Sequence, residues 1–278
     1  MTRMDYHLHS RDSVDSAESV ARMCRRAVEI GLHEVCFTEH YDTDPYDPGY
    51  GFYDDVRYER RLAAAREKFA GRLVIRKGLE FDFQSRYSGR LAARLADWRF
   101  DFVLGSVHNV FGTVVSQAVS DRAFPPDEVY RTYFDEVRAL IDTGLAHCLG
   151  HFDYVRKLCH ALLADYRYAD YDREVADIVA RLVDAGIGLE VNSRYRDVGQ
   201  PLVPGLDVLR AYFDAGGRVV TLGSDAHDAS GVGCGLPEAW RLLRRAGFTE
   251  QMAFEAGRPV RRALPGPDDA LAAASLRD

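Results

Sequence analysis

Short apolar runs alternate along the chain with longer stretches in which apolar residues recur every three or four positions. The first pattern is typical of buried strands, and the second is typical of helices that pack one face against a core. The predicted strands are Met4–His9, Glu34–Thr38, Leu73–Phe83, Phe102–Val107, Leu145–Gly150, Ile187–Asn192 and Val219–Ser224. The predicted helices are Ser16–Ile30, Asp55–Ala70, Arg86–Trp98, Asp127–Thr143, Tyr171–Ala185, Gly205–Ala215 and Pro237–Ala246.

Strict alternation of strands and helices predicts parallel strands joined by crossover helices. We expect a closed or nearly closed barrel, because polar residues follow almost every strand and a barrel gathers all those strand ends at one mouth. The long aromatic loop Tyr41–Tyr53 is expected to cover that mouth. The tail from Pro259 onward is expected to form a surface strap or a partly mobile end.

Composition supports one large domain over residues 1–278, because 47% of the 278 residues are hydrophobic. A net charge of -7 disfavours general binding to nucleic acid or to an anionic membrane surface. We find no apolar run of about 18 residues and no charged-then-apolar leader before Asp5. Five cysteines without a C-x-x-C pair predict reduced thiols. We therefore expect a cytoplasmic protein, and the oligomeric state stays open.

Histidines and carboxylates at the strand ends carry the candidate chemistry. His7 and His9 lie two residues apart, so alternation along a strand places both on one face. Asp225 and His227 repeat this spacing at the last strand. A buried carboxylate such as Glu80 must be paired or bound to a metal, and its two oxygens can bridge two ions. His40, His108 and His151 follow three further strands.

Imidazole and carboxylate groups with no thiolate nearby suit Zn, Mn or Fe bound for catalysis. His33 and His160 have no such context and are assigned to the surface. His147 begins its strand and is assigned to the barrel floor.

Six motifs in order resemble those of the polymerase-and-histidinol-phosphatase (PHP) family, and most closely its histidinol-phosphatase branch. The resemblance extends roughly from Met4 to Phe254. The motifs are His7-x-His9, Thr38-Glu39-His40, Gly78-Leu79-Glu80, Gly105-Ser106-Val107-His108, Gly150-His151-Phe152-Asp153 and Gly223-Ser224-Asp225-Ala226-His227.

The resemblance implies a distorted (β/α)7 barrel with two or three divalent metal ions at the carboxyl ends of the strands. It assigns a first ion to His7, His9, Glu80 and Asp225. Through Glu80 as a bridge, it assigns a second ion to His108 and His151. The resemblance assigns a third ion to His40, His227 and Asp15. Many relatives carry His at position 15, and the harder oxygen ligand of Asp15 shifts preference away from softer metals.

The implied activity is hydrolysis of L-histidinol phosphate, a step of histidine biosynthesis, by attack of a metal-bridging hydroxide. Glu80, Asp225 and His227 are the candidate catalytic residues, and the partner is a small phosphorylated substrate. Guanidinium groups match phosphate bidentately. The candidate substrate-binding residues are accordingly Arg156, Arg194 and Arg196, with Asn192.

Three alternatives stay open at this point. The first is a PHP phosphoesterase for a nucleotide or another small phosphate ester, because the segment Gly199–Pro204 departs from the Tyr-Pro segment common in histidinol phosphatases. The second is a metal hydrolase that cleaves C–N or ester bonds on a related barrel. The third is a non-catalytic metal-binding or scaffold protein.

Overall fold

The structure is a computed structural model that describes residues 2–120, 124–155, 171–194, 202–266 and 269–271. Seven strands form one parallel sheet in the order β1-β2-β3-β4-β7-β8-β9. Leu8 also forms a parallel bridge with Ala226, and the Asp225 amide donates to the His7 carbonyl at 2.8 Å. The sheet therefore closes almost completely, as predicted. Its strands are β1 Met4–Leu8, β2 Glu34–Tyr41, β3 Val74–Asp82, β4 Phe102–Ser106, β7 Cys148–Leu149, β8 Gly188–Asn192 and β9 Val220–Gly223.

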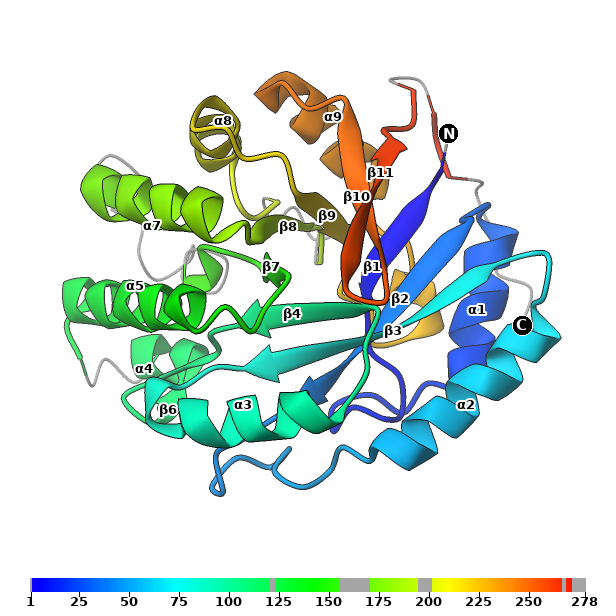
Figure 1. The fold of residues 1–278 in the computed structure, drawn as a ribbon, viewed down its shortest axis with the longest axis horizontal. Helices are drawn as coiled ribbons and strands as arrows, with labels where there is room; N and C mark the ends of the chain where they lie inside the picture. Colours follow the sequence, from blue (N-terminus) through cyan, green and yellow to red (C-terminus); the bar gives the residue numbers. More distant parts are fainter. Residues whose placement is uncertain (1, 121–123, 156–170, 195–201, 267–268, 272–278) are drawn as a thin grey trace.

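Amphipathic helices surround the strands, as Figure 1 shows. Each buries an apolar stripe against the sheet and leaves its polar face outward. The long helices are α1 Val20–Glu29, α2 Asp55–Lys68, α3 Ser88–Asp97, α5 Pro126–Thr143, α7 Asp172–Ala185, α8 Leu206–Asp214 and α9 Leu236–Ala246. Shorter elements are η1 Ser85–Tyr87, α4 Val115–Ser120 and η4 Ala229–Gly231.

The first helix begins later than the sequence pattern predicts. Its N-cap is Ser19, whose side chain accepts a hydrogen bond from the Arg22 amide, so the predicted start at Ser16 is wrong. A serine hydroxyl that satisfies a free amide of the first turn is a strong start signal. Ser16 instead donates to the His227 carbonyl at 2.7 Å, which ties the preceding loop to the barrel mouth.

A hairpin that the sequence pattern did not predict closes the other end of the barrel. Strands β10 (Glu250–Glu255) and β11 (Arg258–Ala263) pair in antiparallel fashion, so the tail expected from Pro259 onward begins as a strand. The hairpin packs on a small apolar cluster at the amino ends of the barrel strands. His147 stacks on Phe254 there, with ring centroids 5.2 Å apart, which confirms its place at the floor.

The mouth end carries a second short hairpin, formed by β5 (Asn109–Val110) and β6 (Thr113–Val114). The loop after β2 borders the mouth through Asp42 and Asp47, in line with the prediction for Tyr41–Tyr53. Cys24, Cys36 and Cys148 are free, buried thiols, and Cys159 lies outside the described residues. None of the helices in the described ranges is long and apolar enough to cross a membrane.

Candidate metal centre

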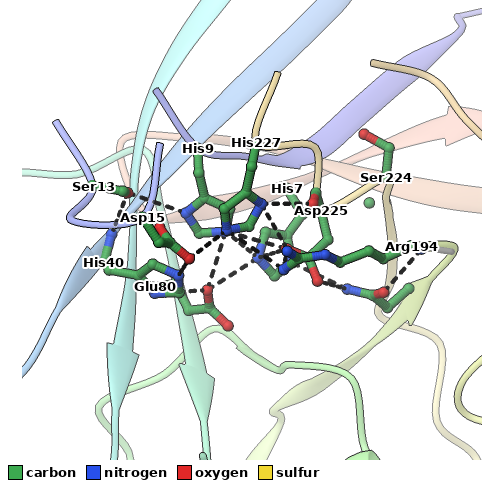
Figure 2. Close-up of polar contacts among 12 residues, drawn as sticks. His7, His9, Ser13, Asp15, His40, Glu80, Arg194, Ser224, Asp225 and His227 are labelled. Carbon is green, nitrogen blue, oxygen red and sulfur yellow. Dashed lines mark hydrogen bonds and ion pairs between the residues drawn. The ribbon is translucent and has the colours of Figure 1, made fainter. Parts of the chain in front are cut away.

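The candidate site lies at the carboxyl ends of the barrel strands, where ligand-type side chains converge (Figure 2). Because the strands are parallel, residues that end them lie on the same rim. Asp225 adopts a left-handed backbone conformation with φ +54°, which costs free energy for a residue other than glycine and is found mostly at functional sites. The converging residues are His7, His9, His40, Glu80, His108, His151, Asp225 and His227.

The first cluster consists of His7, His9 and Asp225, which are all buried. The Nε2 atoms of the two histidines lie 2.8 Å apart. Oδ1 of Asp225 lies 3.6 Å from Nε2 of His7 and 3.5 Å from Nε2 of His9. Three ligand atoms therefore surround one point inside the barrel mouth.

Glu80 lies between the first cluster and a second one. Its Oε1 atom is 2.9 Å from Nε2 of His151 and 3.5 Å from Nε2 of His108. Its Oε2 atom is 3.1 Å from Nε2 of His7 and 3.3 Å from Nε2 of His9. The two oxygens of one buried carboxylate thus face different histidine pairs, which is the arrangement that a bridging ligand requires.

The third group lies at the edge of the mouth and includes Asp15. His9, His40 and His227 form a cluster in which the rings of His9 and His40 stack at 4.1 Å. Oδ2 of Asp15 lies 2.7 Å from Nε2 of His227 and 3.5 Å from Nε2 of His40. The side chain of Asp15 is 45% exposed, so this group is the wettest of the three.

The donor set fits divalent cations better than it fits hydrogen bonding alone. Nε2 atoms face each other in the His7–His9 pair at 2.8 Å and in the His108–His151 pair at 3.1 Å. Two ring nitrogens that face each other can share only one proton in the gap between them, whereas a cation in that gap accepts a lone pair from each. Two of the three clusters include a carboxylate, and Asp15 lies beside the third; carboxylates are the charged ligands that hard and borderline cations favour.

Metal binding requires deprotonated ligands, and the pKa values of these groups are shifted in both directions. Burial lowers the pKa of His7, but the charge of Glu190 outweighs it and holds that pKa well above its usual range. Burial likewise lowers the pKa of His40, but the charge of Glu80 outweighs it and raises that pKa to about 10, so an ion would displace a proton from each of these two imidazoles.

Burial lowers the pKa of His9 to about 4 and that of His108 to about 3, so both imidazoles are neutral. Burial raises the pKa of Glu80, but the charges of His7 and His40 outweigh it and hold that pKa well below its usual range. Glu80 is therefore a carboxylate.

Several residues that support the ligands were missed in the sequence. Glu190 contacts Nδ1 of His7 through Oε1 and accepts the His151 amide through Oε2 at 2.7 Å. A carboxylate at this position orients the imidazole and fixes its tautomer. Ser106 donates to Oε1 of Glu80 at 2.6 Å. A signal for Glu190 was present, because a charged residue inside a buried strand needs a partner.

The structure describes two of the four predicted substrate-binding residues. Arg194 lines the mouth, and its Nη1 atom lies 3.1 Å from Oδ1 of Asp225. Asn192 is buried, and its amide donates to Oδ2 of Asp225 at 3.2 Å, so it is placed to support that carboxylate. Arg156 and Arg196 lie outside the described residues.

A cavity of about 190 Å³ opens over the clusters. Ligand-type residues from all three clusters line it, together with Val14, Asp42, Tyr154 and Arg194. A larger surface cleft of about 530 Å³ lies between α8 and α9 near Leu202 and Arg245, but none of the candidate ligands lines it. The smaller cavity is therefore the candidate active site, because the chemistry and the concave surface coincide there.

Known proteins are similar to this chain in sequence over most of its length. The chain is 28% identical to a histidinol-phosphatase from Lactococcus lactis subsp. lactis over 91% of this chain and 95% of that protein. It is 30% identical to a probable histidinol-phosphatase from Thermotoga maritima, over 88% of this chain and 93% of that protein.

Solved structures agree with the sequence comparison. The fold matches a crystal structure of the Lactococcus lactis histidinol phosphate phosphatase in complex with zinc, L-histidinol and phosphate. That match has a TM-score of 0.78 at 25% identity and covers 93% of this chain and 99% of the other. The PHP domain model matches residues 5–194, which is more than half of the chain. The chain therefore belongs to the PHP domain family.

Proposed function

We propose that the protein is a metal-dependent phosphomonoesterase that hydrolyses L-histidinol phosphate to L-histidinol and phosphate. The observation that carries the proposal is Glu80, whose two carboxylate oxygens face two buried histidine pairs at the mouth of a PHP barrel. Support for the substrate comes from relatives named histidinol-phosphatase and from a similar structure that contains L-histidinol and phosphate.

The proposed ligands follow the three clusters. His7, His9 and Asp225 would hold one ion, and His108 and His151 a second, with Glu80 shared between them. His40, His227 and Asp15 would hold a third. Zn, Mn and Fe all suit this mixture of imidazole and carboxylate. When bound, the ions would supply positive charge that offsets the phosphate dianion and makes water a better nucleophile.

Residues of the chain itself would orient the ester. Arg194 points over the cavity, and its guanidinium can hold two phosphate oxygens in the plane that a bidentate contact requires. Asp225 lies beside Arg194 and can accept a proton from the attacking water. His227 lies at the open edge, where its Nε2 atom would help to hold the third ion beside Asp15, so the proton for the leaving oxygen would come from water.

A panel of phosphate esters tests the proposal. The purified chain loaded with Zn²⁺ or Mn²⁺ is assayed against L-histidinol phosphate, nucleoside monophosphates and simple sugar phosphates. We expect kcat/KM for L-histidinol phosphate to exceed the others by at least about 10-fold, which corresponds to about 1.4 kcal/mol of differential transition-state binding. A nucleotide that wins this comparison would replace the substrate, and absence of turnover on every ester would overturn the activity.

A further inference from the structure

A buried carboxylate beside the metal centre has no role in the function proposed above. Glu39 is fully buried in β2, and every hydrogen bond to it comes from the loop that follows β1. Its oxygens accept the Ser10 amide at 2.9 Å, the Ser10 hydroxyl at 2.6 Å and the Ser13 hydroxyl at 2.6 Å. A buried charge with this many donors is held in one orientation.

Ser13 connects this carboxylate to a proposed metal ligand, as Figure 2 shows for its contacts with His9 and His40. Its Oγ atom lies 2.6 Å from Oε2 of Glu39, 2.9 Å from the His40 amide nitrogen and 3.2 Å from Nδ1 of His9. A hydroxyl has one proton to donate and two lone pairs that accept. Three contacts therefore use its full capacity.

The direction of each hydrogen bond follows from that count. The His40 amide can only donate, so it occupies one lone pair of Ser13. An O–O distance of 2.6 Å is typical of a hydroxyl that donates to a carboxylate, so the Ser13 proton points to Glu39. Nδ1 of His9 must then carry a proton and donate to the remaining lone pair of Ser13.

This assignment leaves Nε2 of His9 without a proton and able to act as a ligand. Nε2 lies 2.8 Å from Nε2 of His7, 3.3 Å from Oε2 of Glu80 and 3.5 Å from Oδ1 of Asp225. If the Ser13 proton pointed to His9 instead, Nδ1 would be the acceptor and Nε2 would carry the proton. That tautomer cannot bind a cation at the first cluster.

We infer that Glu39 and Ser13 form a positioning relay that fixes His9 in the tautomer whose Nε2 atom faces the metal cluster. The relay rests on the metal centre proposed above. Glu190 contacts His7 directly, whereas Glu39 acts on His9 through a hydroxyl. The same hydroxyl holds the backbone of His40, so one buried carboxylate orders parts of two neighbouring strand ends.

One competing arrangement must be separated from the relay. Burial raises the pKa of Glu39 to about 7, although hydrogen bonds from Ser10 and Ser13 lower it. A protonated Glu39 could donate to Ser13, which would then turn its own proton toward His9. The Ser10 amide and hydroxyl both donate to Glu39, and these contacts favour the carboxylate form.

Zinc retention tests the relay with a matched control. The zinc-loaded full chain is challenged with a chromophoric chelator, and the loss of each ion is followed in the wild type, Ser13→Ala and Ser10→Ala. Both serines are buried and donate to Glu39, but only Ser13 contacts His9. We expect Ser13→Ala to weaken zinc binding at the first cluster about 10- to 100-fold, and Ser10→Ala to stay within about threefold of the wild type.

A direct measurement of the tautomer accompanies the chelator assay. In the zinc-loaded chain labelled with ¹⁵N in its histidines, Nδ1 of His9 should carry a slowly exchanging proton. That signal should exchange rapidly in Ser13→Ala and persist in Ser10→Ala. Glu39→Gln supplies a second variant if Ser13→Ala fails to fold, and it should also lose zinc faster.

The outcomes distinguish the relay from the function on which it rests. A wild-type chain that binds no zinc would overturn the proposed function. A wild-type chain that binds zinc, together with unchanged retention in Ser13→Ala and Glu39→Gln, would overturn the relay alone. Equal losses in Ser13→Ala and Ser10→Ala would also overturn it, because the effect would then come from the loop and not from His9.

Discussion

The candidate site has a floor and an outer edge. The floor consists of His7, His9, Glu80, His108, His151 and Asp225, and the edge consists of Asp15, His40 and His227. The two regions use the same residue types but differ in burial and support. On the floor, His7 and Glu80 have side chains that are at most 1% exposed, and buried carboxyl or hydroxyl groups contact them. At the edge, Asp15 comes from a loop and its side chain is 45% exposed. Strands therefore position His7 and Glu80, whereas the edge depends in part on the loop that carries Asp15.

This difference predicts different affinities for the ions. Ligands that are already oriented by a second set of contacts lose little freedom when an ion binds, so the floor should hold its ions firmly. At the edge, water can compete with the exposed side chain of Asp15 for the ion. The aspartate side chain is also shorter than a histidine side chain, so it reaches less far toward the ion. The ion at the edge should therefore be the most exchangeable of the three.

Removal of all metal should have the largest effect. A chelator that strips the ions should abolish phosphatase activity. Among the described residues that line the cavity, no side chain can supply as much positive charge as the clustered ions would, so the charge of the phosphate would no longer be offset. Metal content and turnover are measured on the same samples before and after readdition of Zn²⁺ or Mn²⁺. Full activity in metal-free protein would contradict the proposal.

Glu80→Gln should have the next largest effect, because it keeps the shape of the floor and removes its shared charge. We expect turnover to fall by at least about 100-fold, the scale of a lost electrostatic contact in a transition state. Metal content should fall as well. Glu67→Gln on the exposed face of α2 is the matched control and should behave as the wild type. Near-normal turnover in Glu80→Gln would refute the bridging role.

Asp15→Ala tests the edge and should have a smaller effect. We expect the variant to lose the third ion but to keep the ions on the floor, and to lose activity by about 10-fold on the scale of one removed ligand contact. Excess Mn²⁺ or Zn²⁺ should restore part of the activity. The comparison of floor and edge would fail if Asp15→Ala and His7→Ala lost the same ions.

His147→Ala at the barrel floor should have the smallest effect on activity. The ring stacks on Phe254, and its Nδ1 atom accepts the Val103 amide at 2.9 Å, far from the mouth. Loss of this acceptor should lower the free energy of unfolding by roughly 1–3 kcal/mol. The kcat and the metal content should stay unchanged, which denaturant unfolding and metal analysis of the same preparation can establish.

Much of this architecture could be predicted, because seven apolar runs, six of them with candidate metal ligands in or just after them, specify parallel strands that share a mouth. The hairpin β10–β11 was missed, because its second strand does not show an apolar run. Arg258, Arg261 and Arg262 make that strand mostly charged, since most of its side chains face solvent. Glu190, Ser13 and Glu39 were also missed. Their roles depend on contacts between residues far apart in the chain, such as Glu190 with His7, and spacing within one segment does not show such pairs.

Anomalous scattering from crystals of the zinc-loaded protein is the most direct test of the central claim that Glu80 links two metal sites at the mouth of the barrel. The account predicts two strong peaks on either side of Glu80, one beside His7, His9 and Asp225 and the other beside His108 and His151. A third, weaker peak is expected beside Asp15. A single peak on the floor, or two peaks that Glu80 does not contact, would contradict the account.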